Sequence, residues 1–115
     1  MRIINRTKAA VLADNVEVAE TWVTRLRGLM FRDRLQEKHC LILKPCNSIH
    51  TCFMRFNIDV LFVGDEGEIL YLLENMPPFR FSPIVRKARF IIELPAHTIS
   101  LTGTSLGDRL SNLKE

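Results

Sequence analysis

The sequence lacks most features that mark an exported, membrane-spanning or metal-binding protein. It has three cysteines, Cys40, Cys46 and Cys52, and no two of them are separated by the two residues typical of zinc sites. We therefore expect no metal and no cofactor. No apolar run approaches the roughly 20 residues that cross a bilayer, so we also expect no membrane partner.

The N-terminal residues lack the apolar stretch of a secretory signal peptide. Together with the odd number of cysteines, this predicts a cytoplasmic protein whose three thiols stay reduced. Neither positive nor negative charge dominates, because sixteen Lys and Arg are interspersed with thirteen Asp and Glu. The densest basic group lies in residues 25–34 and has no DNA- or RNA-binding signature, so we expect no nucleic-acid partner.

What the sequence does contain is enough apolar surface for one core. Hydrophobic residues make up 47% of 115 residues, and a core of that size closes without disulfides or metal. We expect a single domain over residues 1–115. Short apolar segments separated by turn signals predict a mainly β fold, a small antiparallel β-sandwich or barrel-like domain with one or two short helices. The expected strands are 9–13, 16–19, 40–43, 47–54, 58–63, 68–73 and 89–94.

Two local patterns give finer expectations. The first two strands flank Asp14-Asn15, residues that tolerate positive φ, which predicts a tight hairpin. The clearest helical pattern lies in residues 21–29, where we expect a helix capped by Thr21 and ended by Gly28. Trp22, Leu26 and Leu29 recur in it at helical spacing.

The most informative residues are ionisable groups inside the most apolar part of the chain. His50 and Asp59 lie there, and burial of such groups requires hydrogen bonds or an ion pair. We expect Asp59 to be buried and to accept hydrogen bonds from backbone amides, from Thr51 or His50, or from Arg27. Glu93 also lies in an apolar strand, but Pro95 follows closely, so we expect its carboxylate to reach solvent.

Five sequence elements occur in an order that resembles the bacterial and archaeal domain-of-unknown-function family 192. The resemblance spans about residues 9–110 and implies a compact, mainly β domain with a short helix carrying the first element. It implies no activity, because none is established for that family. His97 stands where the family usually has glycine. The elements are Arg27-Gly28-Leu29-Met30-Phe31-Arg32, His50-Thr51 with Met54, Ile58-Asp59-Val60-Leu61-Phe62, Glu93-Leu94-Pro95-Ala96 and Gly107-Asp108.

Three functions remain open at this point. The first is a small binding domain with a polar pocket formed by Arg27, His50, Thr51 and Asp59, whose partner is an unidentified small molecule or protein. The second is a hydrolase-like enzyme that uses His50 and Asp59 as an acid–base pair. The third is a structural or interaction domain in which these residues only hold the fold. A shared cleft for His50 and Asp59 would favour the first two.

Overall fold

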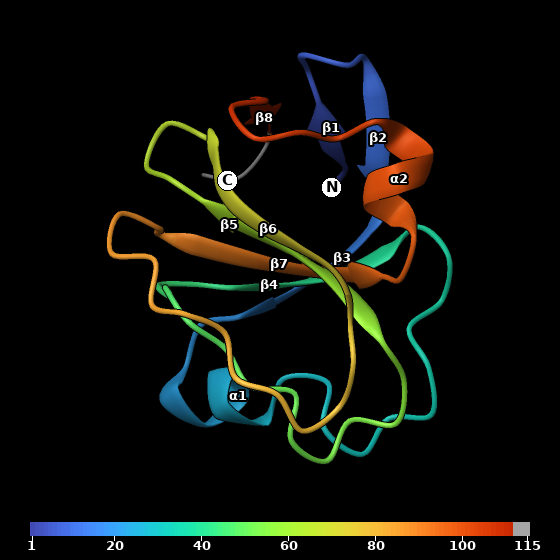
Figure 1. Cartoon of the computed structure of the whole chain (residues 1–115), viewed down its shortest axis with the longest axis vertical. Coiled ribbons are helices and arrows are strands. Elements are labelled where there is room, and N and C mark those ends of the chain that lie inside the picture. The colour runs from blue at the N-terminus through green and yellow to red at the C-terminus, as the bar shows by residue number, and fades with distance from the viewer. Residues whose placement is uncertain (112–115) are drawn as a thin grey trace.

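The computed structural model describes residues 1–111, which form two β-sheets and two short helices (Figure 1). The larger sheet has the strand order β3-β4-β7-β5-β6, and the smaller one has the order β2-β1-β8. The strands are β1 (Ile3–Asn5), β2 (Ala10–Ala13), β3 (Asn15–Ala19), β4 (His39–Leu43), β5 (Ile58–Val63), β6 (Ile69–Met76), β7 (Phe90–Pro95) and β8 (Leu110–Ser111). The helices are α1 (Trp22–Arg27) and α2 (Thr98–Thr102). The mainly β fold predicted from the sequence is confirmed.

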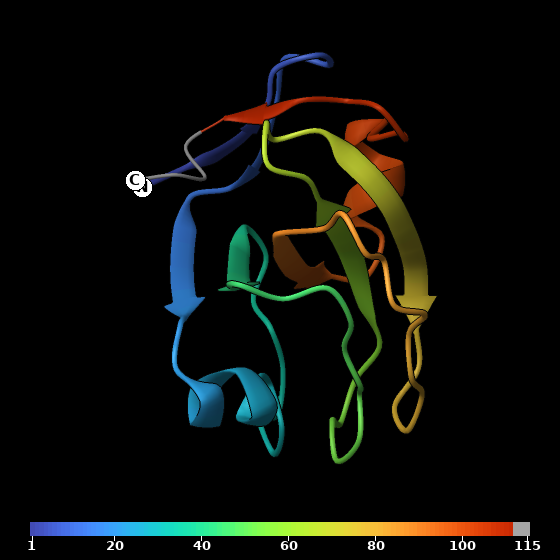
Figure 2. The same ribbon diagram turned by 90° about the vertical axis from the view of Figure 1, so that its left-hand side faces the viewer.

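The predicted hairpin around Asp14 is wrong, although both of its strands exist. β2 pairs with β1 in the smaller sheet, whereas β3 pairs with β4 in the larger one. Only Asp14 separates β2 from β3, too few residues for a two-residue hairpin turn. The chain instead passes from one sheet to the other there (Figure 2). β3 and β4 are also parallel, with α1 in the connection between them, in an otherwise antiparallel sheet.

The larger sheet carries an apolar cluster on each face, as alternation along its central strands requires. Toward the smaller sheet, Leu61 and Leu94 pack with the cluster that includes Ile3. On the opposite face, Val60 and Ile91 pack with the residues around α1 and its neighbouring loops. All six residues of β5 are buried, which confirms the prediction of a strand covered on both sides.

The strand predicted over residues 47–54 does not form. The segment is irregular and has only one bridge, between His50 and Phe81. The Thr51 side chain helps to hold the segment in this irregular form, because its hydroxyl donates to the Pro77 carbonyl at 2.7 Å and accepts from the Arg80 amide at 2.9 Å. Together with backbone bonds of Asn47, Ile49 and Thr51, these bonds fasten the loop to residues 77–85 without a regular ladder. Figure 2 shows both loops projecting from the same end of the molecule as α1.

Helix α1 begins and ends where the sequence predicts. Thr21 is the N-cap, and its side chain and that of Thr24 form a reciprocal capping box at 3.1 Å. Gly28 ends the helix with φ +48°. Nevertheless, α1 buries none of its residues, and Trp22 and Leu26 are exposed. Neither helix in residues 1–111 has the length and apolar character needed to cross a bilayer.

His97→Gly is expected to raise the free energy of unfolding by about 0.5–1 kcal/mol. His97 lies at the N-cap of α2 with φ +77° and forms no side-chain cap bond, so its side chain imposes strain that glycine would not. The gain is smaller than the strain because glycine is also freer in the unfolded chain. Urea denaturation measures it. Ser100→Gly, inside α2, is the control and should lower stability by a similar amount, about 0.5–1 kcal/mol.

Candidate functional site

Glu93 is the most anomalous residue of the structure. It lies in β7 between Leu41 of β4 and Val60 of β5, and only 2% of it is exposed. Its Oε1 atom has no hydrogen-bond partner in the described part of the chain. Burial raises the pKa of its carboxyl to about 8, and the charge of Arg32 only partly opposes that rise. The prediction that Glu93 reaches solvent is wrong, because strands still flank it on both sides.

A cavity of about 200 Å³ adjoins Glu93 on the face of the sheet where α1 lies. Its floor and walls are mainly apolar, and Arg25, Arg27 and the indole of Trp22 also line it. The backbone turn at Gly28 passes against the acid, since a Cβ atom there would lie 3.5 Å from Glu93 Oε1. The lining residues are Trp22, Arg25, Leu26, Arg27, Gly28, Leu29, Met30, Leu43, Cys46, Ser48, Ile49, His50, Met54 and Glu93.

His50 lines this cavity as a fixed imidazole. Its Nδ1 accepts a hydrogen bond from the backbone amide of Cys52 at 3.1 Å. Because an amide can only donate, the ring proton sits on Nε2, which lies 3.3 Å from the Leu26 carbonyl and donates to it. The ring therefore ties its loop to α1, and both of its nitrogens are engaged.

Arg27 and His50 share the cavity, whereas Thr51 and Asp59 are not part of its lining. Asp59 is fully buried and follows the alternation of Leu61, so it lies on the opposite face of the larger sheet. Its two carboxylate oxygens accept from the backbone amides of Asn75 and Ile99, each at 2.8 Å. Burial and bonding to backbone amides are thus confirmed for Asp59.

Asp59 does not make the other contacts considered for it. No ion pair joins it to Arg27 within residues 1–111, and its bonds do not involve Thr51 or His50. The acid–base pair of His50 and Asp59 is therefore not assembled. Asp59 instead fastens the N-terminus of α2, where His97 offers no side-chain bond, to the end of β6.

The comparisons with known proteins identify a family. The model of DUF192, described as "Uncharacterized ACR, COG1430", matches residues 3–112. The chain belongs to this family. It is 33% identical over 112 residues to a "UPF0127 protein" of Thermococcus sibiricus, covering 94% of this chain and 72% of that protein.

Two solved structures share the DUF192 fold seen here. A "putative transcription regulator" from Sinorhizobium meliloti 1021 is 26% identical, with a TM-score of 0.81 over 96% of this chain and 89% of that one. A protein of unknown function from Novosphingobium aromaticivorans has a TM-score of 0.86 at 20% identity, covering 97% of this chain and 84% of that one. The match of the family model confirms the resemblance inferred from the sequence elements, and the two solved structures confirm the fold.

The thiols of this DUF192 chain are free, and two of them are deactivated by burial. Burial raises the pKa of Cys40 to about 12 and also raises the pKa of Cys46. Cys46 lines the Glu93 cavity, where its thiol donates to the Ser48 carbonyl at 3.1 Å. A raised pKa disfavours the nucleophilic thiolate. Within residues 1–111, no group of three His, Cys, Asp or Glu side chains could hold a metal ion.

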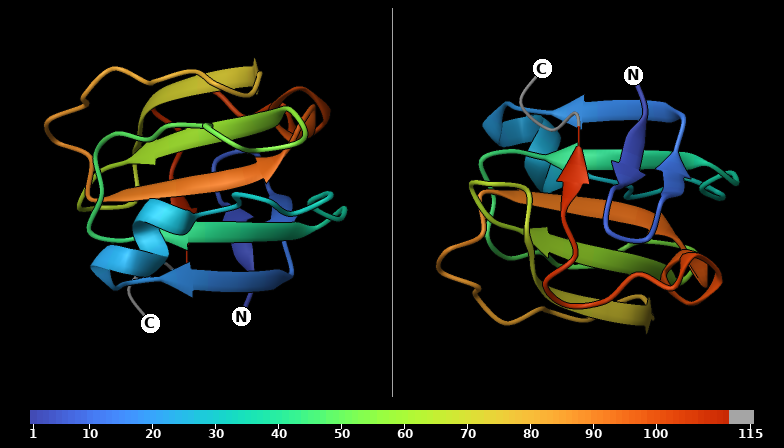
Figure 3. Two further views of the ribbon diagram at one scale, coloured as in Figure 1. Left: turned by 90° about the horizontal axis from the view of Figure 1, so that it is seen from below. Right: turned by 90° about the horizontal axis from the view of Figure 1, so that it is seen from above.

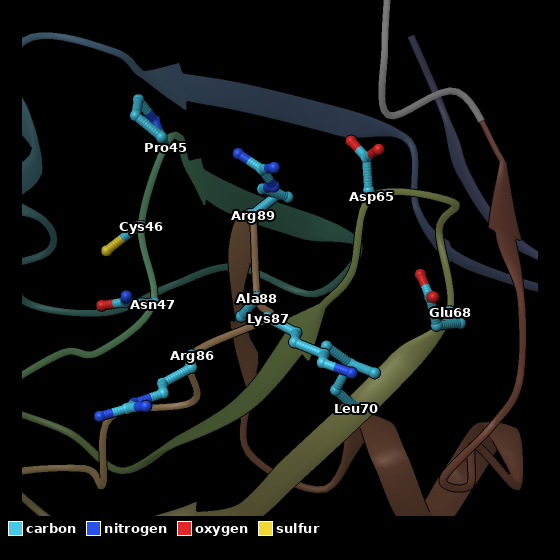
Figure 4. Close-up of a pocket in the computed structure, with 10 residues that line it drawn as sticks. All are labelled: Pro45, Cys46, Asn47, Asp65, Glu68, Leu70, Arg86, Lys87, Ala88 and Arg89. Carbon is cyan, nitrogen blue, oxygen red and sulfur yellow. The ribbon is translucent and has the colours of Figure 1, made fainter.

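A second cavity, of about 580 Å³, also has Cys46 in its lining (Figure 4). Arg86, Lys87 and Arg89 line it together with Asp65 and Glu68, so its charges are mixed. None of these charged side chains is a buried group without a partner. The cavity therefore lacks the feature that distinguishes the Glu93 site.

Sequence reasoning missed Glu93, although a signal was present. In Phe90-Ile91-Ile92-Glu93-Leu94 the acid shares the parity of Ile91, which packs in the cluster below the sheet. The same argument that marked Asp59 as buried applies to Glu93. Pro95 is expected to end the strand near Glu93 and so to leave the carboxylate in solvent. That expectation is wrong, because β7 runs through Glu93 to Pro95 itself.

Proposed function

We propose that this DUF192 chain is a small-molecule-binding domain whose ligand occupies the cavity beside Glu93. The observation that carries this proposal is Glu93, which lines a cavity and whose buried Oε1 atom has no partner in residues 1–111. Buried polar atoms in folded proteins are nearly always hydrogen-bonded. An ionisable side chain with a strongly perturbed pKa beside a pocket is a typical feature of functional sites.

The cavity defines the chemistry of the ligand. Glu93 Oε1 is an acceptor whether or not the other oxygen carries a proton, so the ligand donates a hydrogen bond from a hydroxyl or amine. Leu43, Ile49 and Met54 offer an apolar wall for its body. The volume of about 200 Å³ lies below the range usual for drug-sized ligands, which favours a small metabolite.

The four residues predicted as a site take two roles in this proposal. Arg27 and His50 belong to the binding site, where Arg27 offers a cation for an anionic group and His50 holds α1 over the cavity. Thr51 and Asp59 support the site from outside by fixing the loops and the far side of the sheet. The protein acts as one domain in the cytoplasm, and neither DNA nor RNA is its partner.

Acid catalysis by Glu93 is the second candidate function. A carboxyl whose pKa is about 8 stays largely protonated at neutral pH, as a general acid must be. His50 cannot serve as the accompanying base in this arrangement, because the Cys52 amide and the Leu26 carbonyl occupy its nitrogens. Binding therefore has the better support.

The test is to isolate the protein under native conditions and weigh it with any bound small molecule by mass spectrometry. We expect the parent to carry a ligand that denaturation releases. Glu93→Leu removes the hydrogen-bond acceptor but keeps an apolar side chain of similar size. Its ligand occupancy should fall at least about tenfold, as the loss of one buried hydrogen bond implies.

Glu68→Gln is the control, since Glu68 lines only the second cavity, and it should keep the ligand. Equal occupancy in the parent and in Glu93→Leu would contradict the proposal. Turnover of the released compound by the parent, but not by Glu93→Gln, would favour the catalytic alternative.

A further inference from the structure

Three phenylalanines in three different loops have the same unusual backbone conformation. Phe31, Phe53 and Phe79 have φ of +67°, +62° and +60°. A bulky side chain at such an angle is strained by roughly 1–3 kcal/mol, and glycine or asparagine would be easier there. All three are nevertheless more than half exposed, so the strain is not offset by burial in the core.

The three rings form one cluster. Phe31 stacks on Phe53 with ring centroids 5.6 Å apart, and Phe53 meets Phe79 edge-on at 5.5 Å. The backbone joins the same loops, since the Phe31 amide donates to the Phe53 carbonyl at 3.0 Å and the Phe79 amide donates to the Thr51 carbonyl at 3.0 Å. The three loops are therefore held together, and their aromatic side chains are exposed to solvent.

More exposed apolar residues lie at the same end of the molecule. The loops that carry the three phenylalanines project downward beside α1 (Figures 1 and 2), and a view from below shows α1 and the loops beneath the larger sheet (Figure 3, left). The His50 ring lies 6.4 Å from the Phe81 ring, and its Nε2 is hydrogen-bonded to the Leu26 carbonyl of α1. His50 therefore links the loop that carries Phe81 to helix α1. We call this set the aromatic end; its exposed members are Trp22, Val23, Leu26, Phe31, Phe53, Phe79, Phe81 and Ile84.

The charge around the aromatic end is positive. The segments that carry its members, 21–32, 50–57 and 77–84, contain five arginines and no Asp or Glu, and Glu20 precedes the first of them. Arg32 pairs with Glu17, and Arg55 pairs with Asp33, the acid that follows the first segment, both at 2.8 Å. Arg27 and Arg80 are exposed and form no ion pair with any residue of 1–111.

We propose that the aromatic end docks on the surface of a membrane that contains anionic phospholipid. Unpaired arginines complement phosphate headgroups, and exposed Trp, Phe, Leu and Ile side chains enter the boundary between headgroups and acyl chains. The apolar groups stand on α1 and on projecting loops, which together meet a flat surface more readily than a narrow peptide or nucleic-acid strand. Aliphatic members such as Val23 and Ile84 offer nothing for bases to stack on.

This surface contact differs from the membrane partnership that the sequence analysis considered. That expectation rested on the absence of a bilayer-crossing run, and a protein that lies on a membrane needs none. The inference shares Trp22, Leu26 and Arg27 with the cavity beside Glu93 but requires no ligand there, because it rests on the loop tips and their charges.

The test uses the full chain and vesicles of phosphatidylcholine alone or mixed in equal parts with phosphatidylglycerol. Trp22 is the only tryptophan and belongs to the aromatic end, so its emission should shift to the blue on docking. We expect binding to the mixed vesicles, weaker binding at high salt, and at least about tenfold weaker binding to pure phosphatidylcholine.

The double variant Phe53→Asn, Phe79→Asn should lose more than about tenfold in vesicle affinity, since each ring contributes buried apolar area. Asparagine tolerates positive φ, so this variant should be at least as stable as the parent, which separates lost docking from lost folding. Leu101→Asn is the matched control, because Leu101 is 83% exposed on α2 and lies outside the aromatic end; it should bind like the parent.

Failure of the parent to bind mixed vesicles would overturn the proposal, and so would unchanged binding by the double variant. Equal binding to neutral vesicles would refute the role of the arginines. A single-stranded oligonucleotide or an acidic peptide bound in preference to mixed vesicles would assign the aromatic end to that partner instead.

Discussion

Asp59→Ala is expected to lower the free energy of unfolding by about 3–5 kcal/mol, a large part of the stability of a small domain. The reason is that the variant leaves the buried backbone amide of Ile99 and the partly buried amide of Asn75 without an acceptor, and opens a cavity where the carboxylate was. Ile99 lies in the first turn of α2, and Asn75 lies in the bulge of β6 between the pairs Val60–Leu73 and Ile58–Met76. Urea denaturation followed by circular dichroism measures the loss.

Two variants control this experiment. Asp59→Asn keeps one acceptor oxygen but turns an amide group toward the second backbone N–H, so we expect a loss of about half that of alanine. Asp33→Ala removes an exposed carboxylate whose ion pair with Arg55 is a surface one, and it should change stability by less than about 1 kcal/mol. An Asp59→Ala protein as stable as the parent would show that the two amides find other acceptors.

The stability of the parent is expected to fall as the pH rises from about 4.5 to about 8, the interval between the ordinary pKa of Glu93 and its raised value. In this interval the unfolded chain has released the Glu93 proton and the folded chain still holds it, so each step upward in pH favours unfolding. The full contribution is present below pH 4.5 and is lost above pH 8. It amounts to up to about 4–5 kcal/mol.

Glu93→Gln cannot titrate, so the difference in stability between this variant and the parent isolates the effect. We expect the variant to gain on the parent progressively from pH 5 to pH 8, as measured by thermal melts in matched buffers. Glu37→Gln, at an exposed position, serves as the control. A constant difference across that range would mean that Glu93 is ionised throughout, and that a cation or water in the cavity compensates its charge.

The sequence predicts those features of the structure that depend on interactions between residues near one another in the chain. Thr21 and Gly28 bound α1 because a cap and a left-handed residue act within one turn of helix. β5 could be placed because six consecutive apolar-rich residues favour a strand covered on both faces. The aspartate inside it had to be hydrogen-bonded, although the sequence left open whether side chains or backbone would supply the donors.

The errors all concern which segments meet. The residues around Asp14 favour a turn, but whether the chain turns back or crosses to a second sheet depends on the partner strands, β1 for β2 and β4 for β3. Residues 47–54 alternate like a strand, yet Thr51 binds the loop at Pro77 and Arg80 instead. Trp22 and Leu26 have helical spacing, but α1 lies over a cavity and not over packed side chains.

The sequence by itself determined the mainly β class, the short helix, the family and the burial of Asp59, because composition, periodicity and caps act between near neighbours in the chain. Only the tertiary structure decided the candidate site. It brought Glu93 of a central strand against Gly28 of the α1 turn, joined His50 to that helix, and set Asp59 on the opposite face of the sheet. Which polar group is left without a partner depends on contacts between distant segments, and no local pattern contains those contacts.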